Sequence, residues 1–258
     1  MSLCPDHHPA RPRVSVLIVV YNAIAEAQDC LASLAERTSS PIETIVVDNA
    51  SPQGGAEGLA RLFPQIRLIQ NQENVGFARA VNQAAEASRG EYLLLLNPDA
   101  RLLNDAVKLL ADWLDTHPQA GLAGPRLVNP DGSLQTSTYC FPSLAQSAAH
   151  LFLLKKLLPL SLLRRLAPAW LGRRVGQLSR HDRPQPVDYC TGAALMLRRR
   201  VWEELGGLDE RFFLYYEEKD LSLRAVRAGW QTWFVPAARV GHAIGASAET
   251  APQAAALA

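Results

Sequence analysis

Hydrophobic and polar positions follow two rhythms along the first half of the chain. Short runs rich in β-branched residues or leucine are typical of buried parallel strands, and they predict strands at 14–20, 42–47, 66–70 and 91–96. Between them, apolar residues recur every three or four positions, as on one face of an amphipathic helix. This second pattern predicts helices at 25–37, 57–63, 78–88 and 104–117.

The alternation of strand and helix predicts an α/β fold. Consecutive β-α units form a mostly parallel sheet with helices on both of its faces. A chain of 258 residues holds one large domain of this kind or two small ones. We expect a single domain at 13–243, a disordered tail at 1–12 and a flexible, alanine-rich tail at 244–258.

Polar side chains follow three of the predicted strands at the point where each ends. They are Tyr21 and Asn22, Asp48 and Asn49, and Asn97 and Asp99. In parallel α/β sheets, ligands bind at the carboxyl ends of the strands, so these residues predict one shared cleft. The alternative is that Asn and Asp simply end the strands as turn residues.

An acidic cluster follows an aromatic segment near the carboxyl end of the chain. Glu217, Glu218 and Asp220 come directly after Phe-Phe-Leu-Tyr-Tyr at 212–216. Crowding carboxylates beside apolar residues costs free energy, which is tolerated at a site that needs a base or a cation. Asp220 also has a structural interpretation, as a helix cap or as the partner of Arg224 four residues later.

Composition and charge narrow the class of protein. Of all residues, 48% are hydrophobic, as in an ordinary globular protein, and a net charge of +1 argues against a nucleic-acid partner. The cysteines are far apart in sequence, which favours a reducing compartment: Cys4, Cys30, Cys140 and Cys190. We find neither a signal peptide nor about 18 consecutive uncharged apolar residues, and therefore expect a cytoplasmic protein.

The common nucleotide-binding motifs are missing. Neither the glycine fingerprint of dinucleotide-binding folds nor the P-loop occurs after the first strand. A nucleotide must then be held in another way. Asp48 can accept a hydrogen bond from a base or a ribose, and Arg79 can reach a base or a phosphate.

Six segments stand in the order found in one enzyme family. They are Val-Leu-Ile-Val-Val-Tyr-Asn at 16–22, Ile-Val-Val-Asp-Asn-Ala-Ser at 45–51, Asn-Val-Gly-Phe-Ala-Arg-Ala-Val-Asn at 74–82, Leu-Leu-Asn-Pro-Asp at 95–99, Cys-Thr-Gly-Ala-Ala-Leu-Met-Leu-Arg at 190–198, and the segment 212–224. Together they resemble the family 2 inverting glycosyltransferases of GT-A fold, most closely the rhamnosyltransferase-like branch. The resemblance covers roughly 13–242 and implies a nucleotide-binding sheet flanked by helices.

The resemblance implies a role for each matching residue. Glu218 takes the position of the catalytic base, and Asp99 that of the metal ligand, with His242 as a second candidate ligand. Thr191, Gly192 and Glu217 fall on the acceptor side. The residues that it places at the nucleotide sugar are Tyr21, Asn22, Asp48, Asn49, Gly76, Phe77, Arg79, Asn82 and Asn97.

Two motifs depart from the family pattern. The usual Asp-x-Asp metal motif begins here with Asn97, so Asp99 is its one secure ligand, and the usual Glu-Asp base motif reads Glu217-Glu218. The chemistry asks for these residue types, because an inverting transfer needs a base to deprotonate the acceptor hydroxyl. A hard cation, Mg²⁺ or Mn²⁺, neutralises the leaving diphosphate. For His242, a phosphate contact and an ordinary loop position remain alternatives.

A basic, leucine-rich insert is expected at about 144–183. Paired cations such as Lys155 and Lys156 lie among leucines, and 144–181 contains no acidic residue. Short amphipathic helices of this kind suit the surface of an anionic membrane, which predicts peripheral contact with the inner face of the cell membrane. A helical flap over the active site is the alternative, whereas stacking aromatics for nucleic acid do not alternate with the charges.

The sequence thus predicts an enzyme that moves a sugar, rhamnose or a related hexose. The donor would be dTDP-rhamnose or a UDP-sugar, and the acceptor a glycan or lipid-linked glycan of cell-surface polysaccharide synthesis. Two alternatives remain: a nucleotidyltransferase and an inactive nucleotide-sugar-binding module.

Overall fold

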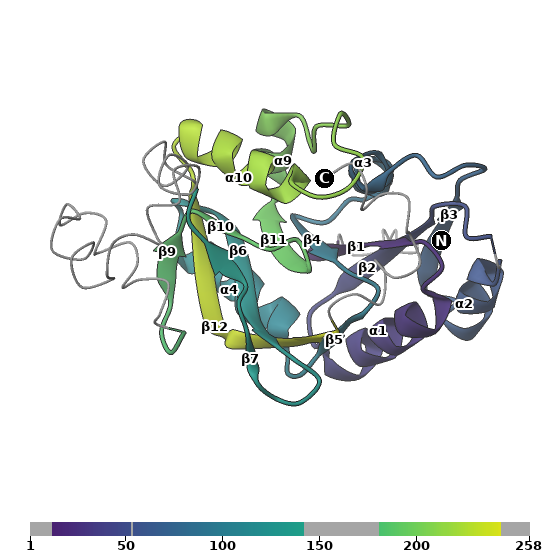
Figure 1. Ribbon diagram of the computed structural model, residues 1–258. Helices are drawn as coiled ribbons and strands as arrows, with labels where there is room; N and C mark the ends of the chain where they lie inside the picture. Colours follow the sequence, from purple (N-terminus) through teal and green to yellow (C-terminus); the bar gives the residue numbers. More distant parts are fainter. Residues whose placement is uncertain (1–11, 53, 142–180, 244–258) are drawn as a thin grey trace, which may run out of the picture.

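The structure, a computed structural model, describes residues 12–52, 54–141 and 181–243 (Figure 1). In chain order its elements are β1 (Val14–Val20), α1 (Ile24–Arg37), β2 (Ile42–Asp48), α2 (Ala56–Leu62), β3 (Ile66–Gln70), α3 (Phe77–Glu86), β4 (Tyr92–Leu96), β5 (Ala100–Leu102), α4 (Ala106–Thr116), β6 (Ala120–Val128), β7 (Leu134–Gln135), β8 (Thr138–Tyr139), β9 (Gln185–Val187), β10 (Tyr189–Cys190), β11 (Ala194–Arg198), α9 (Arg199–Leu205), α10 (Glu217–Arg227) and β12 (Gln231–His242).

A central sheet of ten strands organises these elements. Its main path runs β3-β2-β1-β4-β11-β6-β12-β5, and β8 and β10 form a separate pair. Strands β3, β2, β1 and β4 are mutually parallel, whereas β11 is antiparallel to β4 and to β6. The predicted parallel sheet is therefore confirmed, with antiparallel strands added beyond β4.

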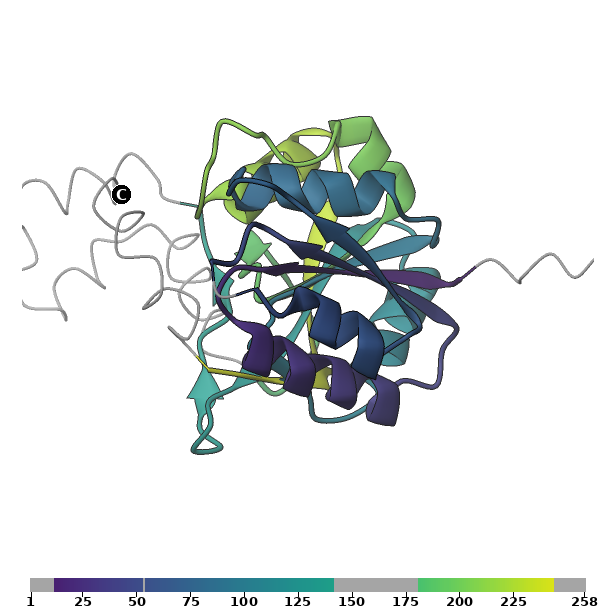
Figure 2. The ribbon, with the colours of Figure 1, turned by 90° about the vertical axis from the view of Figure 1, so that its right-hand side faces the viewer.

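Helices cover both faces of the sheet because the strand residues alternate between two cores. Val16 and Ile18 of β1 pack in one core with α1, α2 and α4, whereas Leu17 and Val19 pack in the other with α3, α9 and α10. Figure 2 shows these two helical layers above and below the twisted strands. Strand β1 is buried along its whole length, as its continuous apolar sequence predicts.

The predicted elements of the first half are all present. The strands at 14–20 and 66–70 are exact, and the other predicted helices and strands differ by one or two residues at their ends. Several later strands, among them β6 and β12, were not expected. Residues 1–11 of the predicted N-terminal tail, the tail at 244–258 and most of the insert, at 142–180, lie outside the described residues. No helix in the described part is long and apolar enough to cross a membrane.

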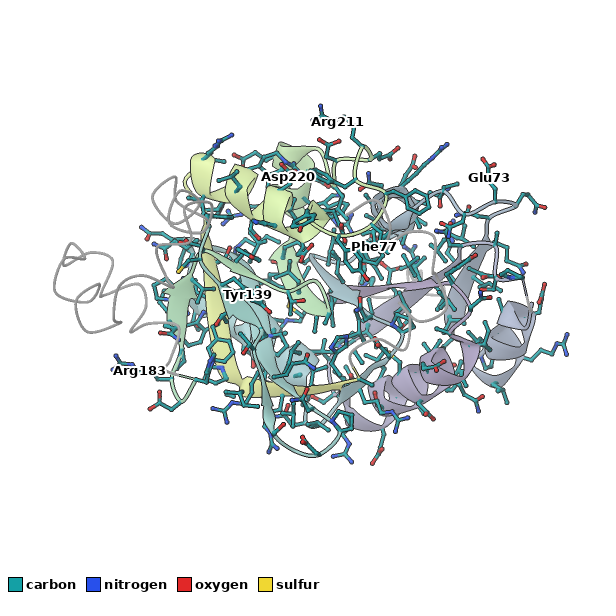
Figure 3. All side chains as sticks on the ribbon, viewed as in Figure 1. Glu73, Phe77, Tyr139, Arg183, Arg211 and Asp220 are labelled. Atoms are coloured by element: carbon teal, nitrogen blue, oxygen red, sulfur yellow. The ribbon has the colours of Figure 1, made fainter. Side chains whose placement is uncertain are left out.

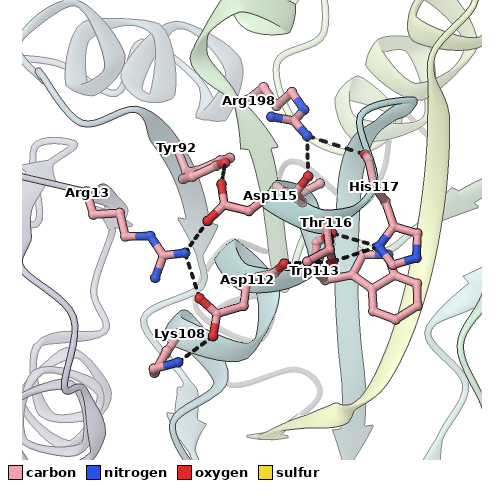
Figure 4. A network of polar contacts seen from close by, with 10 residues as sticks. Arg13, Tyr92, Lys108, Asp112, Trp113, Asp115, Thr116, His117 and Arg198 are labelled. Atoms are coloured by element: carbon pink, nitrogen blue, oxygen red, sulfur yellow. Dashed lines mark hydrogen bonds and ion pairs between the residues drawn. The ribbon is translucent and has the colours of Figure 1, made fainter.

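A polar network joins β1, β4 and α4 at the edge where β1 begins (Figure 4). Arg13, just before β1, donates to Asp112 at 2.6 Å and to Asp115 at 2.5 Å, both on α4. The buried Tyr92, at the start of β4, donates its hydroxyl to Asp115 as well. This network ties to a helix the end of the sheet that lies opposite the carboxyl ends of β1 and β4.

Arg198 closes the same helix at its carboxyl end. Its guanidinium donates to the carbonyl oxygens of Leu114, His117 at 3.3 Å and Ala120 at 2.8 Å. The carbonyls of Leu114 and His117 each accept a backbone N–H as well, from His117 at 3.2 Å and from Ala120 at 2.8 Å. Arg198 adds a charged donor to them, and a cation at a helix carboxyl end complements the helix dipole.

We expect Arg198→Met to lower the free energy of unfolding by about 2–3 kcal/mol, because partly buried carbonyls lose a charged donor. Denaturant unfolding at neutral pH measures this change. The exposed Arg239 of β12 provides the control, and Arg239→Met should change stability by less than about 0.5 kcal/mol. Equal stability of both variants would show that Arg198 contributes nothing as a cap.

Candidate functional site

The carboxyl ends of β1, β2 and β4 meet at one rim of the sheet, since these strands run parallel and adjacent. Two later strands reach the same rim. The backbone N–H of Asn97 donates to the carbonyl of Ala193, just before β11, at 2.9 Å. His242, at the end of β12, pairs with Ala100 of β5, the residue after Asp99. The rim thus gathers segments from both halves of the chain.

Asp99 and His242, the two predicted metal ligands, lie side by side. Nε2 of His242 is 3.4 Å from Oδ1 of Asp99 and 3.3 Å from Nδ2 of Asn97. On its other side, Nδ1 of His242 lies 2.8 Å from Oε1 of Gln135, whose amide nitrogen donates to Asn129 and to the carbonyl of His242. Gln135 therefore accepts the Nδ1 proton, which leaves the lone pair of Nε2 directed at Asp99 and Asn97.

This pair fits a divalent cation. Oδ1 of Asp99 is buried and accepts no hydrogen bond, so this carboxylate oxygen and the lone pair of the imidazole are both available to a cation. Two ligands bound at about 2.1 Å and in tetrahedral to octahedral geometry are about 3.0–3.4 Å apart, close to the observed separation. No three His, Cys, Asp or Glu side chains gather around a common point in the described residues. Further ligands would have to come from a substrate.

The predicted base lies over the predicted acceptor segment. A Cβ placed on Gly192 would lie 3.5 Å from Cβ and 3.6 Å from Cγ of Glu218, so the carboxylate side chain packs against that glycine. Desolvation raises the pKa of Glu218, although backbone N–H groups, including that of Gly192, offset part of the rise. Thr191 precedes Gly192 and is held by its N–H, which donates to the carbonyl of Ser137 at 3.0 Å.

Glu217 is buried beside Glu218, and its Oε2 has no hydrogen-bond partner. Burial, followed by repulsion from the Glu218 carboxylate, raises the pKa of Glu217 to about 7. Two adjacent acids thus differ in environment, an arrangement that separates acid and base roles at active sites. Nearby Asp220 binds Arg224 at 2.7 Å, which confirms its structural interpretation.

The aromatic segment before these acids has a strained backbone and is fixed by contacts with the start of α3. Tyr215 and Tyr216 have φ angles of 69° and 72°, in the left-handed region that bulky residues rarely adopt. The carbonyl of Phe213 accepts from the N–H of Phe77 at 2.7 Å. A Cβ on Gly76 would lie 2.9 Å from Phe213, so only glycine allows the close approach. The segments expected at the nucleotide sugar and at the base therefore touch.

The ends of β1 and β2 hold each other through a serine that we did not anticipate. Ser51 donates its hydroxyl to Oδ1 of Asp48 at 2.6 Å and accepts the N–H of Asn22 at 3.1 Å. Asp48 thus has a turn-forming role through one oxygen, while no described residue donates to its Oδ2. Asn22 has a positive φ of 53°, its Oδ1 is buried without a partner, and the adjacent Tyr21 is half-buried.

Three residues expected at the nucleotide sugar are engaged elsewhere. Asn49 is buried, donates to Asn74 and Gly76, and accepts from Asn71 and Val75, so all its amide groups hold the 71–76 loop. Asn82 donates to Leu208 and Glu210 and accepts the N–H of Leu208. Exposed Arg79 lies 4.0 Å from Glu210. These positions favour structural roles for Asn49 and Asn82, and place Arg79 at the surface.

Some of the predicted site residues carry buried polar atoms that have no hydrogen-bond partner. Nine buried side-chain atoms in the described part lack a hydrogen-bond partner, and three of them belong to Asn22, Asp99 and Glu217. Each such atom costs free energy in a folded protein and calls for an explanation. At the rim, a bound ligand would supply the missing partners of these three atoms.

Sequence reasoning missed the residues that orient this site. Gln135 aligns His242 from 107 positions away, and Ser51 links two strand ends. Neither residue type nor local spacing signals such a contact, because it depends on strand pairing between distant segments. The pairing of β12 with β5 is likewise invisible in the sequence.

The chain was compared with known proteins. A family model described as Glycosyl transferase family 2 matches residues 15–206. N-acetylglucosaminyl-diphospho-decaprenol L-rhamnosyltransferase of Mycobacterium tuberculosis is 30% identical over 242 residues, which cover 88% of this chain and 75% of that protein.

Solved structures share the fold. GalNAc-T7 with UDP, GalNAc and Mn²⁺ aligns with a TM-score of 0.65 at 17% identity, over 91% of this chain and 44% of that one. The mannosyltransferase PcManGT of Pyrobaculum calidifontis, with GDP-Man and Mn²⁺, aligns with a TM-score of 0.61 at 19% identity, over 92% of this chain and 58% of that one. The chain therefore spans about half the length of these two structures.

The six sequence motifs agree with the fold shared with the solved structures, with the family model and with the mycobacterial relative. The chain belongs to glycosyl transferase family 2.

Proposed function

We propose that this protein transfers a sugar, rhamnose or a related hexose, from a nucleotide-diphosphate sugar to a lipid-linked glycan, with inversion at the transferred carbon. The observation that carries the proposal is the packing of Glu218 over Gly192 at the rim that also holds Asp99. The named activity of the mycobacterial relative supports rhamnose as the sugar and a lipid diphosphate as the acceptor. Family membership favours sugar transfer over nucleotidyl transfer.

In this proposal Glu218 removes the proton from the acceptor hydroxyl. Its raised pKa makes it a stronger base than an exposed carboxylate. Glu217, with a pKa of about 7, holds a proton through most of the acidic range. Below neutral pH, Glu217 would therefore lie on the acceptor side as a neutral acid. The role of base would then fall to the carboxylate of Glu218.

On the donor side, Asp99 and Nε2 of His242 would hold Mg²⁺ or Mn²⁺ together with the donor diphosphate. When bound, such a cation neutralises the charge that develops on the leaving diphosphate. The Mn²⁺ in the titles of the two solved structures supports this choice of metal. The amide of Asn97 takes the position of the first acid in the family motif, and it lies next to His242.

The nucleotide would lie along the ends of β1 and β2. Tyr21, Asn22 and the free Oδ2 of Asp48 offer the polar atoms, and Gly76 and Phe77 line the adjoining segment. The donor would be dTDP-rhamnose or a UDP-sugar. Because the expected acceptor is lipid-linked, a cytoplasmic protein would meet it at the inner membrane surface, through the basic insert at 144–183.

The first prediction concerns the base. Glu218→Gln keeps the size of the side chain but accepts no proton, so turnover should fall by about 10²–10⁴-fold. Donor affinity, measured by calorimetry, should stay nearly unchanged. Glu203→Gln, on the exposed side of α9, is the control. Turnover within a factor of about three of wild type would move the base to another residue.

The second prediction concerns the cation. With a nucleoside diphosphate present, Asp99→Ala and His242→Ala should each weaken Mn²⁺ binding at least about tenfold, because each removes a ligand. Electron paramagnetic resonance of free Mn²⁺ measures this without any transfer. Glu36→Ala, at the carboxyl end of α1, where 69% of the side chain is exposed, should bind Mn²⁺ normally. Normal binding by the Asp99 variant would instead leave the diphosphate to be neutralised by Arg or Lys side chains.

The third prediction concerns Glu217 and pH. The pKa of its carboxyl rises from 4.5 to about 7 on folding, so the folded chain keeps a proton that the unfolded chain releases. Stability from this group is therefore fully present below about pH 4.5 and falls as pH rises to about 7, by about 3 kcal/mol in total.

In the Glu217→Gln variant, the free energy of unfolding should no longer fall as pH rises over this range. Denaturant unfolding at several pH values measures this difference. The exposed Glu203→Gln should leave the wild-type slope in place. Identical slopes in wild type and the Glu217 variant would mean that the group ionises normally in the folded chain.

A further inference from the structure

An aromatic surface lies next to the helix that carries the base. Tyr139 of β8 and Tyr189 of β10 are cross-strand partners, and their rings stack with centroids 5.2 Å apart and planes 18° apart. The ring of Phe141 stacks on Tyr189 at 5.5 Å. We call these three rings the aromatic platform. Figure 3 shows Tyr139 beneath α10, the helix that carries Asp220, and α10 packs on β10.

A cation lies against this platform. Nζ of Lys219 is 5.7 Å from the ring centroid of Tyr189 and 5.3 Å from that of Tyr216, so two aromatic rings flank one ammonium group. Lys219 forms no ion pair with any residue that the structure describes. Aromatic faces stabilise a positive charge without neutralising it, which keeps the ammonium available to an anion.

One short segment connects the platform, the base and the strand end that carries Asp99. Tyr189 precedes Gly192, against which Glu218 packs, and the next residue, Ala193, binds the backbone of Asn97. The charge of Glu218 also contributes to raising the pKa of Tyr189 to about 12, after burial, which places the phenol near the carboxylate. A molecule whose hydroxyl reaches Glu218 can thus contact the platform as well.

We propose that the aromatic platform and Lys219 form the acceptor subsite, in which a pyranose ring packs on Tyr189 and Tyr139 while its phosphate pairs with Lys219. This inference rests on the proposed function and specifies its acceptor as a sugar carried on a diphosphate. The C–H face of a pyranose is apolar and suits an aromatic ring, with 38% of Tyr139 exposed to receive it. A compact, strongly charged ammonium suits a phosphate.

Two soluble acceptors separate the contributions of sugar and phosphate. One is N-acetylglucosamine on a short alkyl diphosphate, and the other is the same sugar as a neutral alkyl glycoside. Lys219→Gln should raise KM for the diphosphate acceptor about tenfold or more, with donor affinity nearly unchanged, and leave KM for the neutral acceptor as it was. Because the charge of Lys219 also lowers the pKa of Glu218, any change in kcat should be the same for both acceptors. Tyr189→Leu should raise KM for both.

Matched variants exclude general effects. Lys219→Arg keeps the cation and should restore most of the affinity for the diphosphate acceptor. Arg227→Gln removes an exposed cation from the same helix and should change neither KM. Thermal unfolding shows whether each variant folds. No vesicles are present, so a role of Lys219 towards lipid headgroups alone would leave both KM values unchanged and overturn the proposal.

Binding of the diphosphate acceptor to the Glu218→Gln protein, measured by calorimetry, separates this inference from the proposed function. Binding that depends on Lys219 without any transfer by wild type would overturn the function and leave the subsite. Transfer by wild type with equal KM changes for both acceptors, or with none, would overturn the subsite and leave the function. Absence of acceptor binding to the folded protein would likewise overturn the subsite.

Discussion

The pairing of β11 with β4 is the constraint on which the site depends. Ala194 lies opposite Leu96, and the hydrogen bond from Asn97 to Ala193 extends this ladder by one step beyond the strand. A shift by one residue would turn every side chain of β11 to the other face of the sheet. The register therefore sets Gly192, and with it Glu218, opposite the strand end that carries Asp99.

Local sequence patterns were sufficient for the first half of the fold. The β1 and β4 segments are apolar on both faces, which only a sheet covered on both sides explains, and the helices between them have a single apolar stripe. The same patterns failed for β6 and β12. Strand β12 contains Pro236 and exposed residues, and it changes register against β6, so its sequence lacks the regular rhythm of a strand.

The structure shows which of the proposed site residues lie together. Asp99 and His242 were proposed together, and they lie side by side although 142 positions stand between them in the sequence. Asp99 lies in the turn before β5, and His242 ends the neighbouring β12. Asn49 and Asn82 show the opposite outcome, because an amide at a strand end or on a helix has the same sequence signature whether it binds a ligand or a loop. Only the hydrogen-bond partners distinguish the two, and those partners come from loops distant in sequence.

The junction at Phe141 bears on how this protein can diversify. Its backbone N–H donates to the Asp188 side chain at 2.7 Å, and the adjoining β8 and β10 are paired. The free energy of loop closure grows only slowly with loop length. Changes in the length of the chain between Phe141 and Asp188 should therefore cost this pairing little.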